Sequence, residues 1–206
     1  MNFPKIDTSY YHQKNVVNLA EKMLGKMLFT NFNNKVTGGI ITEAEAYNGI
    51  YDRACHAFGG RRTPRTETMY ALGGVSYVYL CYGIHHLFNI VTNKKDIPDA
   101  ILIRAIEPTH GVSTMLKRRN KNKIDKTLSG GPGTVSQALG ISVKNNALDL
   151  SGSKIWIAES GLKIKKNQIA SSARIGCESA GEDGKLPYRF NLINAKKELD
   201  SFKNSN

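Results

Sequence analysis

The sequence predicts one α+β domain over residues 1–206, in which a mostly antiparallel β-sheet is flanked by a few helices. Short runs with alternating or β-branched apolar residues dominate the chain. Turn residues such as Asn33-Asn34 and Gly83-Ile84 join neighbouring runs as hairpins. Helical periodicity is confined to a few stretches. No internal repeat or low-complexity linker divides the chain, and its length is sufficient for a single hydrophobic core.

The first part of the chain is expected to form a helix followed by a hairpin. Residues 14–24 carry apolar side chains at helical spacing, and Gly25 follows as a C-terminal cap. Residues 26–32 and 36–47 then read as two strands around the Asn33-Asn34 turn. The apolar helix face comprises Val16, Leu19, Ala20, Met23 and Leu24.

Two carboxylates share one face of the second predicted strand. In the run ITEAEAY, alternation places Glu43, Glu45 and Tyr47 on one side and two small alanines on the other. A face meant for a core would not carry carboxylates, because burying them without partners is costly. We therefore expect this face to line a solvated cleft; the pattern alone fits a functional site and a plain solvated sheet edge equally well.

Between residues 48 and 66 the sequence predicts a loop rich in glycine and arginine, which contains His56. The guanidinium groups of such a loop suit phosphates, although a simple solvated loop explains the composition as well. A short helix is expected over residues 67–72. The basic side chains of the loop are Arg61, Arg62 and Arg65.

Residues 75–82 alternate strictly, with Tyr77 and Tyr79 on one face, and Gly83-Ile84 separates them from the strand run at 85–92. Tyr82 therefore falls at the tip of a hairpin. An exposed tyrosine there is suited to wedge between base pairs, although folding back on its own hairpin is the commoner arrangement.

Arg104 interrupts a buried-looking strand at residues 100–108. An arginine within an apolar run needs an anionic partner, and the face carrying Glu43 and Glu45 is the obvious candidate. Residues 111–126 hold six basic residues against one acid, which favours a mobile solvated loop over a phosphate-tracking patch.

The last third begins with a glycine-rich turn that opens into a helix over residues 130–140, a structural element or a phosphate contact. Further strands are expected at 154–160, 162–170 and 188–193, followed by a helix over 195–202.

Composition points to a polyanion as partner, because 29 Lys and Arg against 17 Asp and Glu give a formal net charge of +12. Three widely spaced cysteines indicate reduced intracellular thiols. No apolar run approaches the roughly 20 residues that span a bilayer, so we expect a soluble cytoplasmic protein. No metal site is expected, because Cys55, Cys81 and the histidines lack standard ligand spacing.

Several motifs in order resemble the alkyladenine (3-methyladenine) DNA glycosylase family: EAEAYNG, CHAFGGRRTPR, SYVYLCYGIHHLFN, ILIRAIEP, GGPGTVSQALG and RIGC…AGE…PYRF. The resemblance covers nearly the whole chain. It implies a curved antiparallel sheet with a protruding β-hairpin that inserts into DNA. It also implies hydrolysis of the N-glycosidic bond of a flipped alkylated or deaminated purine: 3-methyladenine, 7-methylguanine, hypoxanthine or ethenoadenine.

The resemblance also assigns roles to residues of this sequence. Glu45 looks like the base that activates water, and Arg104 looks like the group that helps to hold that water, which leaves Glu43 as a structural partner. Glycosidic cleavage passes through an oxocarbenium-like state, which a carboxylate beside the sugar stabilises. Tyr47, His56 and Tyr79 resemble the walls that stack on the base, where aromatic faces favour a cationic purine.

The remaining positions carried over concern the base edge and the DNA. Asn89 corresponds to the residue that meets the minor-groove edge of the base and excludes guanine. Tyr82 corresponds to the side chain that fills the gap left by the flipped nucleotide. The backbone contacts expected from the resemblance are Arg61, Thr63, Ile84 and His85.

The resemblance implies no cofactor, no metal and no lyase step, since no lysine lies within the motifs. It implies double-stranded DNA with damaged purines as partner and a monomer, associated with the nucleoid in a prokaryote. A non-catalytic damaged-DNA-binding module is the main alternative and predicts salt-sensitive binding with no base release. A hydrolase of free nucleosides leaves the arginine loop and the hairpin tip unexplained.

Overall fold

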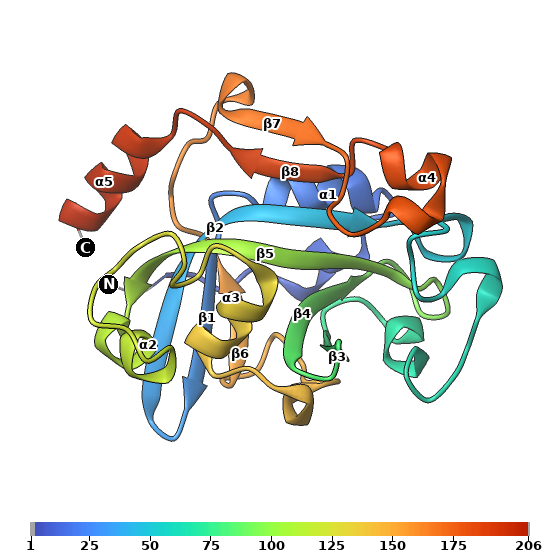
Figure 1. Ribbon diagram of the computed structural model, residues 1–206, viewed down its shortest axis with the longest axis horizontal. Coiled ribbons are helices and arrows are strands. Elements are labelled where there is room, and N and C mark those ends of the chain that lie inside the picture. Colours follow the sequence, from blue (N-terminus) through green and yellow to red (C-terminus); the bar gives the residue numbers. More distant parts are fainter. Residues whose placement is uncertain (1–2, 206) are drawn as a thin grey trace.

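One strongly curled antiparallel sheet organises the computed structural model, which describes residues 3–205 (Figure 1). Its main path runs β3-β4-β5-β2-β1-β6, and β8 pairs with both β2 and β7. All pairings are antiparallel. The strands are β1 (Met27–Phe32), β2 (Lys35–Tyr47), β3 (Ser76–Cys81), β4 (His85–Thr92), β5 (Asp99–His110), β6 (Ile155–Ala158), β7 (Ile169–Ser172) and β8 (Arg189–Leu192).

The helices are short and stand around the sheet, as the α+β prediction requires (Figure 1). The α-helices are α1 (Val16–Met23), α2 (Val112–Arg118), α3 (Pro132–Leu139), α4 (Glu182–Lys185) and α5 (Lys196–Ser205). Short 3₁₀ helices lie at Thr8–His12, Gly49–Tyr51, Phe58–Gly60, Glu67–Tyr70, Val143–Asn145, Lys166–Gln168 and Glu178–Ala180. Within the described residues, no helix is long and apolar enough to cross a membrane.

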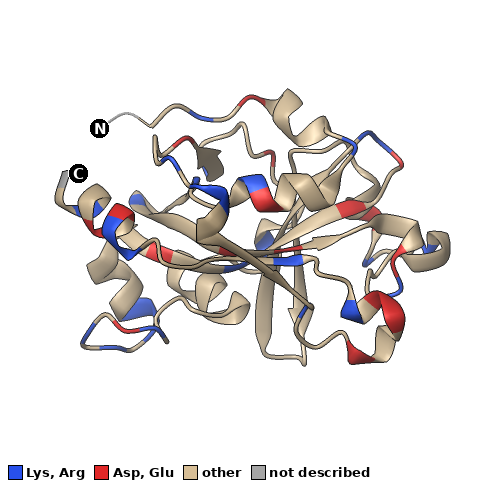
Figure 2. Ribbon diagram, turned by 90° about the horizontal axis from the view of Figure 1, so that it is seen from above, with Lys and Arg blue, Asp and Glu red and all other residues tan. Residues whose placement is uncertain are grey.

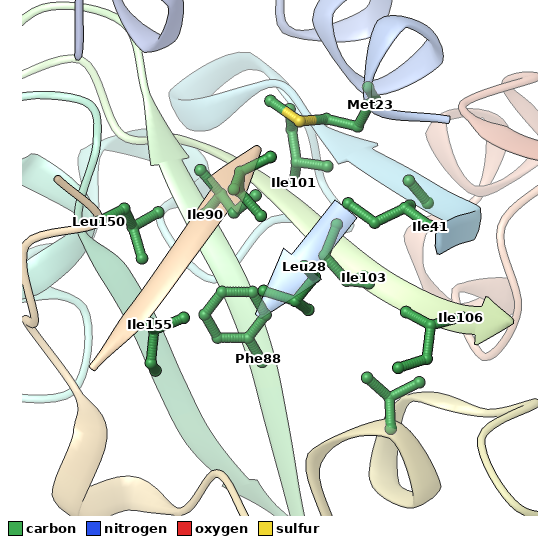
Figure 3. Packing of buried hydrophobic residues seen from close by; sticks show 14 of the residues in the cluster. Met23, Leu28, Ile41, Phe88, Ile90, Ile101, Ile103, Ile106, Leu150 and Ile155 are labelled. Atoms are coloured by element: carbon green, nitrogen blue, oxygen red, sulfur yellow. The ribbon is translucent and has the colours of Figure 1, made fainter. Parts of the chain in front are cut away.

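The two faces of the sheet have different surroundings, because successive side chains of a strand point to opposite sides. On β5, Ile101 and Ile103 are buried in the main core, where they pack with Phe88 and with side chains of α1 and α3 (Figure 3). Leu102 and Arg104 point to the other face. That face carries the candidate site.

The N-terminal helix and hairpin confirm the sequence prediction. The Asn15 side chain accepts from the backbone N–H of Asn18 and caps α1. Asn33 and Asn34 have φ of 54° and 58°, so the two turn residues adopt the left-handed conformation that a type I′ hairpin turn needs and asparagine tolerates.

Two of the secondary-structure predictions are wrong. Residues 112–118 form helix α2 rather than a mobile loop, because Met115 is fully buried and two basic residues lie in the favourable last turn. The segment that follows α2 is also fixed, because the Arg119 side chain donates to the backbone carbonyl groups of Thr127 and Leu128.

Residues 162–168 are not a strand, because only Ile169–Ser172 pairs with the four-residue strand β8.

The loop at 48–66 also differs from its prediction, which gave it no part in a core. Cys55 and Ala57 are buried against Tyr77, Met69 and Tyr70 in a second cluster on the face opposite the main core. Two of the 3₁₀ helices lie within this segment. The loop therefore has a fixed position over the sheet, which places His56.

Gly111 offers a test of the backbone geometry that joins β5 to α2. Its φ is +64°, and a Cβ there would lie 2.2 Å from the carbonyl oxygen of Val36. We expect Gly111→Ala to lower the free energy of unfolding by about 2–4 kcal/mol, from left-handed strain plus overpacking. Gly161, with φ of +78° and no atom within 4 Å, is the matched control, for which strain alone predicts about 1–2 kcal/mol. Equal losses in urea unfolding would contradict the steric argument.

Candidate active site

The pairing of β2 with β5 brings Glu45 beside Arg104, as the sequence predicts. Glu45 Oε2 accepts hydrogen bonds from Arg104 Nη1 at 3.2 Å and from the Tyr47 hydroxyl at 2.9 Å. Its Oε1 accepts from the backbone N–H of Ile175 at 2.9 Å. The Glu45 side chain has no exposed surface, so the expectation that it faces solvent is wrong. Hydrogen bonds from protein donors stabilise its carboxylate in place of water.

Arg104 also binds the other carboxylate of the strand. Its Nε donates to Glu43 Oε1 at 2.9 Å, and the same oxygen accepts from Arg189 Nε at 2.6 Å. Burial favours the neutral form of Arg104, but Glu45 and Glu43 outweigh it and raise the pKa of the guanidinium. The two carboxylates and two arginines form one network, in which Glu43 links β2 to β5 and β8.

An aromatic wall stands next to this network. His56 Nδ1 is hydrogen-bonded to the Tyr77 hydroxyl at 2.9 Å, and the His56 ring meets the Tyr79 ring edge-on, with centroids 4.6 Å apart. Burial lowers the pKa of His56 to about 4, with further contributions from Arg65 and Arg61. The imidazole is therefore neutral at pH 7. Burial, followed by the charge of Glu45, raises the pKa of Tyr47 well above its usual range, so its hydroxyl stays protonated.

Asn89 lies on β4 directly opposite Tyr77 of β3. It is buried, with 3% of its surface exposed. Its side-chain amide donates to the backbone carbonyl groups of Tyr77 at 3.1 Å and Leu87 at 3.3 Å. These two bonds fix the orientation of the amide.

The aromatic groups, Asn89 and Arg104 line one cavity of about 680 Å³, and Glu45 lies behind its wall. Tyr47, His56, Tyr79, Asn89 and Arg104 contribute to its wall, and Tyr82 and His85 extend it along the hairpin. The start of α3, from Gly131 to Thr134, also lines the cavity. Its size and its mostly apolar wall with a few polar groups are typical of a pocket for a small molecule. Of the residues predicted for the site, Glu45, Arg61, Thr63 and Ile84 do not line the cavity.

The hairpin tip holds Tyr82 away from the protein. The backbone N–H of Ile84 donates to the Cys81 carbonyl group at 3.2 Å, and Tyr82 and Gly83 have positive φ, which closes a tight turn. Tyr82 is 89% exposed and Ile84 is 71% exposed. The alternative in which Tyr82 folds back on its own hairpin is therefore wrong for this structure.

Arg61 and Thr63 lie in the arginine loop beside the cavity. The backbone carbonyl group of Arg61 accepts from the hydroxyls of Thr66 and Tyr70, and Thr63 N–H donates to the Thr66 hydroxyl at 2.9 Å. The Arg61 side chain is exposed. The loop backbone is thus fixed while this guanidinium remains accessible.

A buried ion pair that the sequence did not predict, between Arg174 and Asp52, packs against the Tyr47 ring. Arg174 donates to both carboxylate oxygens of Asp52 and to the backbone carbonyl groups of Ala46 and Asp183. Its guanidinium lies 4.9 Å from the centre of the Tyr47 ring. The partners are 122 residues apart in sequence, and no periodicity connects them. The pair anchors the segment whose Ile175 N–H binds Glu45.

Like Arg65 of the arginine loop, Tyr77 is a wall residue that the sequence singled out without assigning it to the site. Its alternation with Tyr79 places both rings on one face, and their centroids are 5.5 Å apart. Among residues 3–205, no group of histidine, cysteine and acidic side chains is arranged to hold a metal ion.

Comparison with known proteins gives a consistent result. A family model described as methylpurine-DNA glycosylase matches residues 9–196. A protein of Chlamydia felis is 43% identical over 92% of this chain and 96% of its own length, and one of Chlamydia pneumoniae is 42% identical over 89% and 92%. A Clostridium acetobutylicum protein is 38% identical over 90% and 93%. All three bear the provisional name 3-methyladenine DNA glycosylase.

Removing one partner of the buried Arg174–Asp52 pair is expected to cause a large loss of stability. Asp52→Ala leaves the Arg174 charge buried without its carboxylate, so we expect the free energy of unfolding to fall by about 3–5 kcal/mol in urea titrations. Glu182→Ala removes the acid of an exposed pair with Lys185 and should cause no measurable change. A similar effect of both variants would contradict the assignment of Asp52 as a structural anchor.

Proposed function

The chain belongs to the methylpurine-DNA glycosylase family, and on this premise we propose that it excises damaged purines by hydrolysing their N-glycosidic bonds. The observation that carries the proposal is the enclosed carboxylate of Glu45, bound by Arg104 and Tyr47 next to an aromatic cavity. The substrates proposed are 3-methyladenine, 7-methylguanine, hypoxanthine and ethenoadenine in duplex DNA.

In the proposed reaction Glu45 acts on both the water and the sugar. As the N-glycosidic bond lengthens, positive charge develops on the sugar, and the nearby carboxylate stabilises it. The purine leaves with the electron pair of the N-glycosidic bond, as a neutral base if alkylation had made it cationic and otherwise as an anion that takes a proton from solvent. The direct contact between Arg104 Nη1 and Glu45 Oε2, 3.2 Å in the free protein, opens to admit a water, which attacks the anomeric carbon and gives its proton to the carboxylate. Arg104 is already fixed by Glu43, so its guanidinium needs little reorganisation to hold the water.

The aromatic wall binds the extruded base in this proposal. Tyr47, His56 and Tyr79 provide ring surfaces for stacking, and the fixed amide of Asn89 tests the edge of the base. The neutral imidazole of His56 adds no charge at pH 7. Stacking accepts any purine ring, so selection for damage depends on the edge contacts and on how easily the base leaves the duplex.

The hairpin tip supports base flipping. Extrusion of a nucleotide costs a few kcal/mol, and the exposed Tyr82 ring is available to fill the vacated space and offset part of that cost. Arg61, Thr63, Ile84 and His85 are proposed to contact the DNA backbone around it. Lysines and arginines lie on many separate segments of the ribbon rather than in one patch, which suits a broad attraction to a polyanion (Figure 2).

The cavity wall suggests that the reaction stops at base release. No lysine is among the described residues that line it, so no amine is available there to form a Schiff base with the sugar. We therefore propose a monofunctional enzyme that leaves an abasic site. We further propose that it acts as a monomer on chromosomal DNA, without a cofactor.

Glu45→Gln tests the proposed base. The amide keeps the shape of the side chain but cannot accept a proton, so single-turnover release of hypoxanthine from a duplex oligonucleotide should fall at least about 10²-fold. Affinity for the same duplex should change little. Free base released at the wild-type rate would refute the role of Glu45. Binding without release by the wild type itself would support the binding-module alternative.

Tyr82→Ala tests the wedge. Loss of the ring should slow release from a fully paired duplex about tenfold or more, and should slow release from a single strand much less, because no gap is left to fill there. Tyr51→Ala is the matched control, since that tyrosine is 79% exposed on another loop. The wedge assignment would be wrong if both variants behaved alike on the two substrates.

A further inference from the structure

Arg65 is an arginine of the cavity wall to which the proposed reaction gives no role. Its guanidinium carbon lies 5.2 Å from the centre of the Tyr79 ring, and its Nη2 is 3.5 Å from His56 Nε2. It therefore contacts two of the three aromatic groups proposed to stack on the base. Its side chain reaches the cavity from the arginine loop, where Pro64 precedes it.

The charge of Arg65 is not neutralised within the protein. No carboxylate in residues 3–205 forms an ion pair with it. Arg62 of the same loop is the contrast, because it binds Glu67 at 2.7 Å and Asp96 at 2.9 Å and lies over the Tyr70 ring. The same loop thus holds one paired arginine away from the cavity and one exposed, unpaired arginine on the cavity wall.

Two tyrosines of the wall already have a cation against the ring. Arg65 lies over Tyr79, and Arg174, which does not line the cavity, lies 4.9 Å from the centre of the Tyr47 ring. A ring that already interacts with one cation attracts a second cation less strongly. The preference for cationic purines expected from aromatic walls alone is therefore opposed by the protein's own arginines.

We propose that Arg65 sets the charge preference of the base pocket, favouring neutral damaged purines such as hypoxanthine over purines made cationic by alkylation of a ring nitrogen. The inference rests on the proposed function. A cationic base would enter the same cavity as an unpaired guanidinium, and like charges repel there. A neutral purine meets no such repulsion, and the planar guanidinium can stack on it or donate to its acceptor atoms.

The same arginine acts on His56, which gives an independent readout. The groups that face His56 are the Tyr77 hydroxyl, the Tyr79 ring, Arg65 and, further away, Arg61. Burial lowers the pKa of His56 to about 4, and the two arginines act in the same direction. Loss of the Arg65 charge should therefore raise this pKa, which an NMR titration of the His56 imidazole in Arg65→Gln and Arg62→Gln measures directly.

The test compares Arg65→Gln with Arg62→Gln, which removes the same charge from the same loop. Single-turnover release is measured for hypoxanthine in a duplex oligonucleotide and for 3-methyladenine in methylated duplex DNA. We expect Arg65→Gln to raise the ratio of 3-methyladenine to hypoxanthine release about tenfold, equivalent to about 1.4 kcal/mol. Arg62→Gln should leave the ratio unchanged, and Arg65→Lys, which keeps the charge, should stay near the wild type.

The outcomes separate this inference from the proposed function. A ratio unchanged in Arg65→Gln, with affinity for both DNAs reduced equally, would make Arg65 a phosphate contact and overturn the inference alone. A His56 pKa that does not rise in Arg65→Gln would count against it as well. Release of neither base by the wild type would overturn the proposed function and this inference with it.

Discussion

The site depends on one constraint, which is that a fully buried carboxylate must be surrounded by donors. Glu45 has three: the Arg104 guanidinium, the Tyr47 hydroxyl and the backbone N–H of Ile175. These come from β5, from β2 itself and from a segment that is remote in sequence. Burial of the carboxylate without these donors would cost several kcal/mol. The Glu45 side chain therefore requires both the observed register of β2 with β5 and the packing of the segment around Ile175 against them.

The later segment has its own anchor, and this explains why a second buried ion pair lies so close to the first. Arg174 holds Asp52 and two backbone carbonyl groups, which fixes both the loop before Cys55 and the chain around Ile175. The Tyr47 ring is fixed from both sides, by its hydroxyl on Glu45 and by the guanidinium behind it. The carboxylate and the aromatic wall therefore form one rigid unit, which a reaction sensitive to small displacements requires.

Away from this unit, the protein has exposed apolar side chains and an unpaired arginine that do not contribute to its stability. Tyr82 and Ile84 expose large apolar surfaces on a tight turn, and Arg65 stands without a carboxylate next to the cavity. Stability alone favours neither arrangement. Under the proposed function, a DNA duplex would supply both a base stack and phosphates, which are the surroundings that such groups lack in the free protein.

Local periodicity and turn chemistry were enough to predict several features of the site. Alternation put Glu43 and Glu45 on one side of a strand, turn residues put Tyr82 at a hairpin tip, and the apolar run around Arg104 required an anionic partner. Only the tertiary structure decided that Glu45 is enclosed rather than solvated, that Arg174 binds Asp52, that residues 112–118 are helical, and that Arg65 rather than Arg62 enters the cavity. Periodicity describes neighbours along the chain, whereas burial and charge pairing depend on which distant segments the sheet topology brings together.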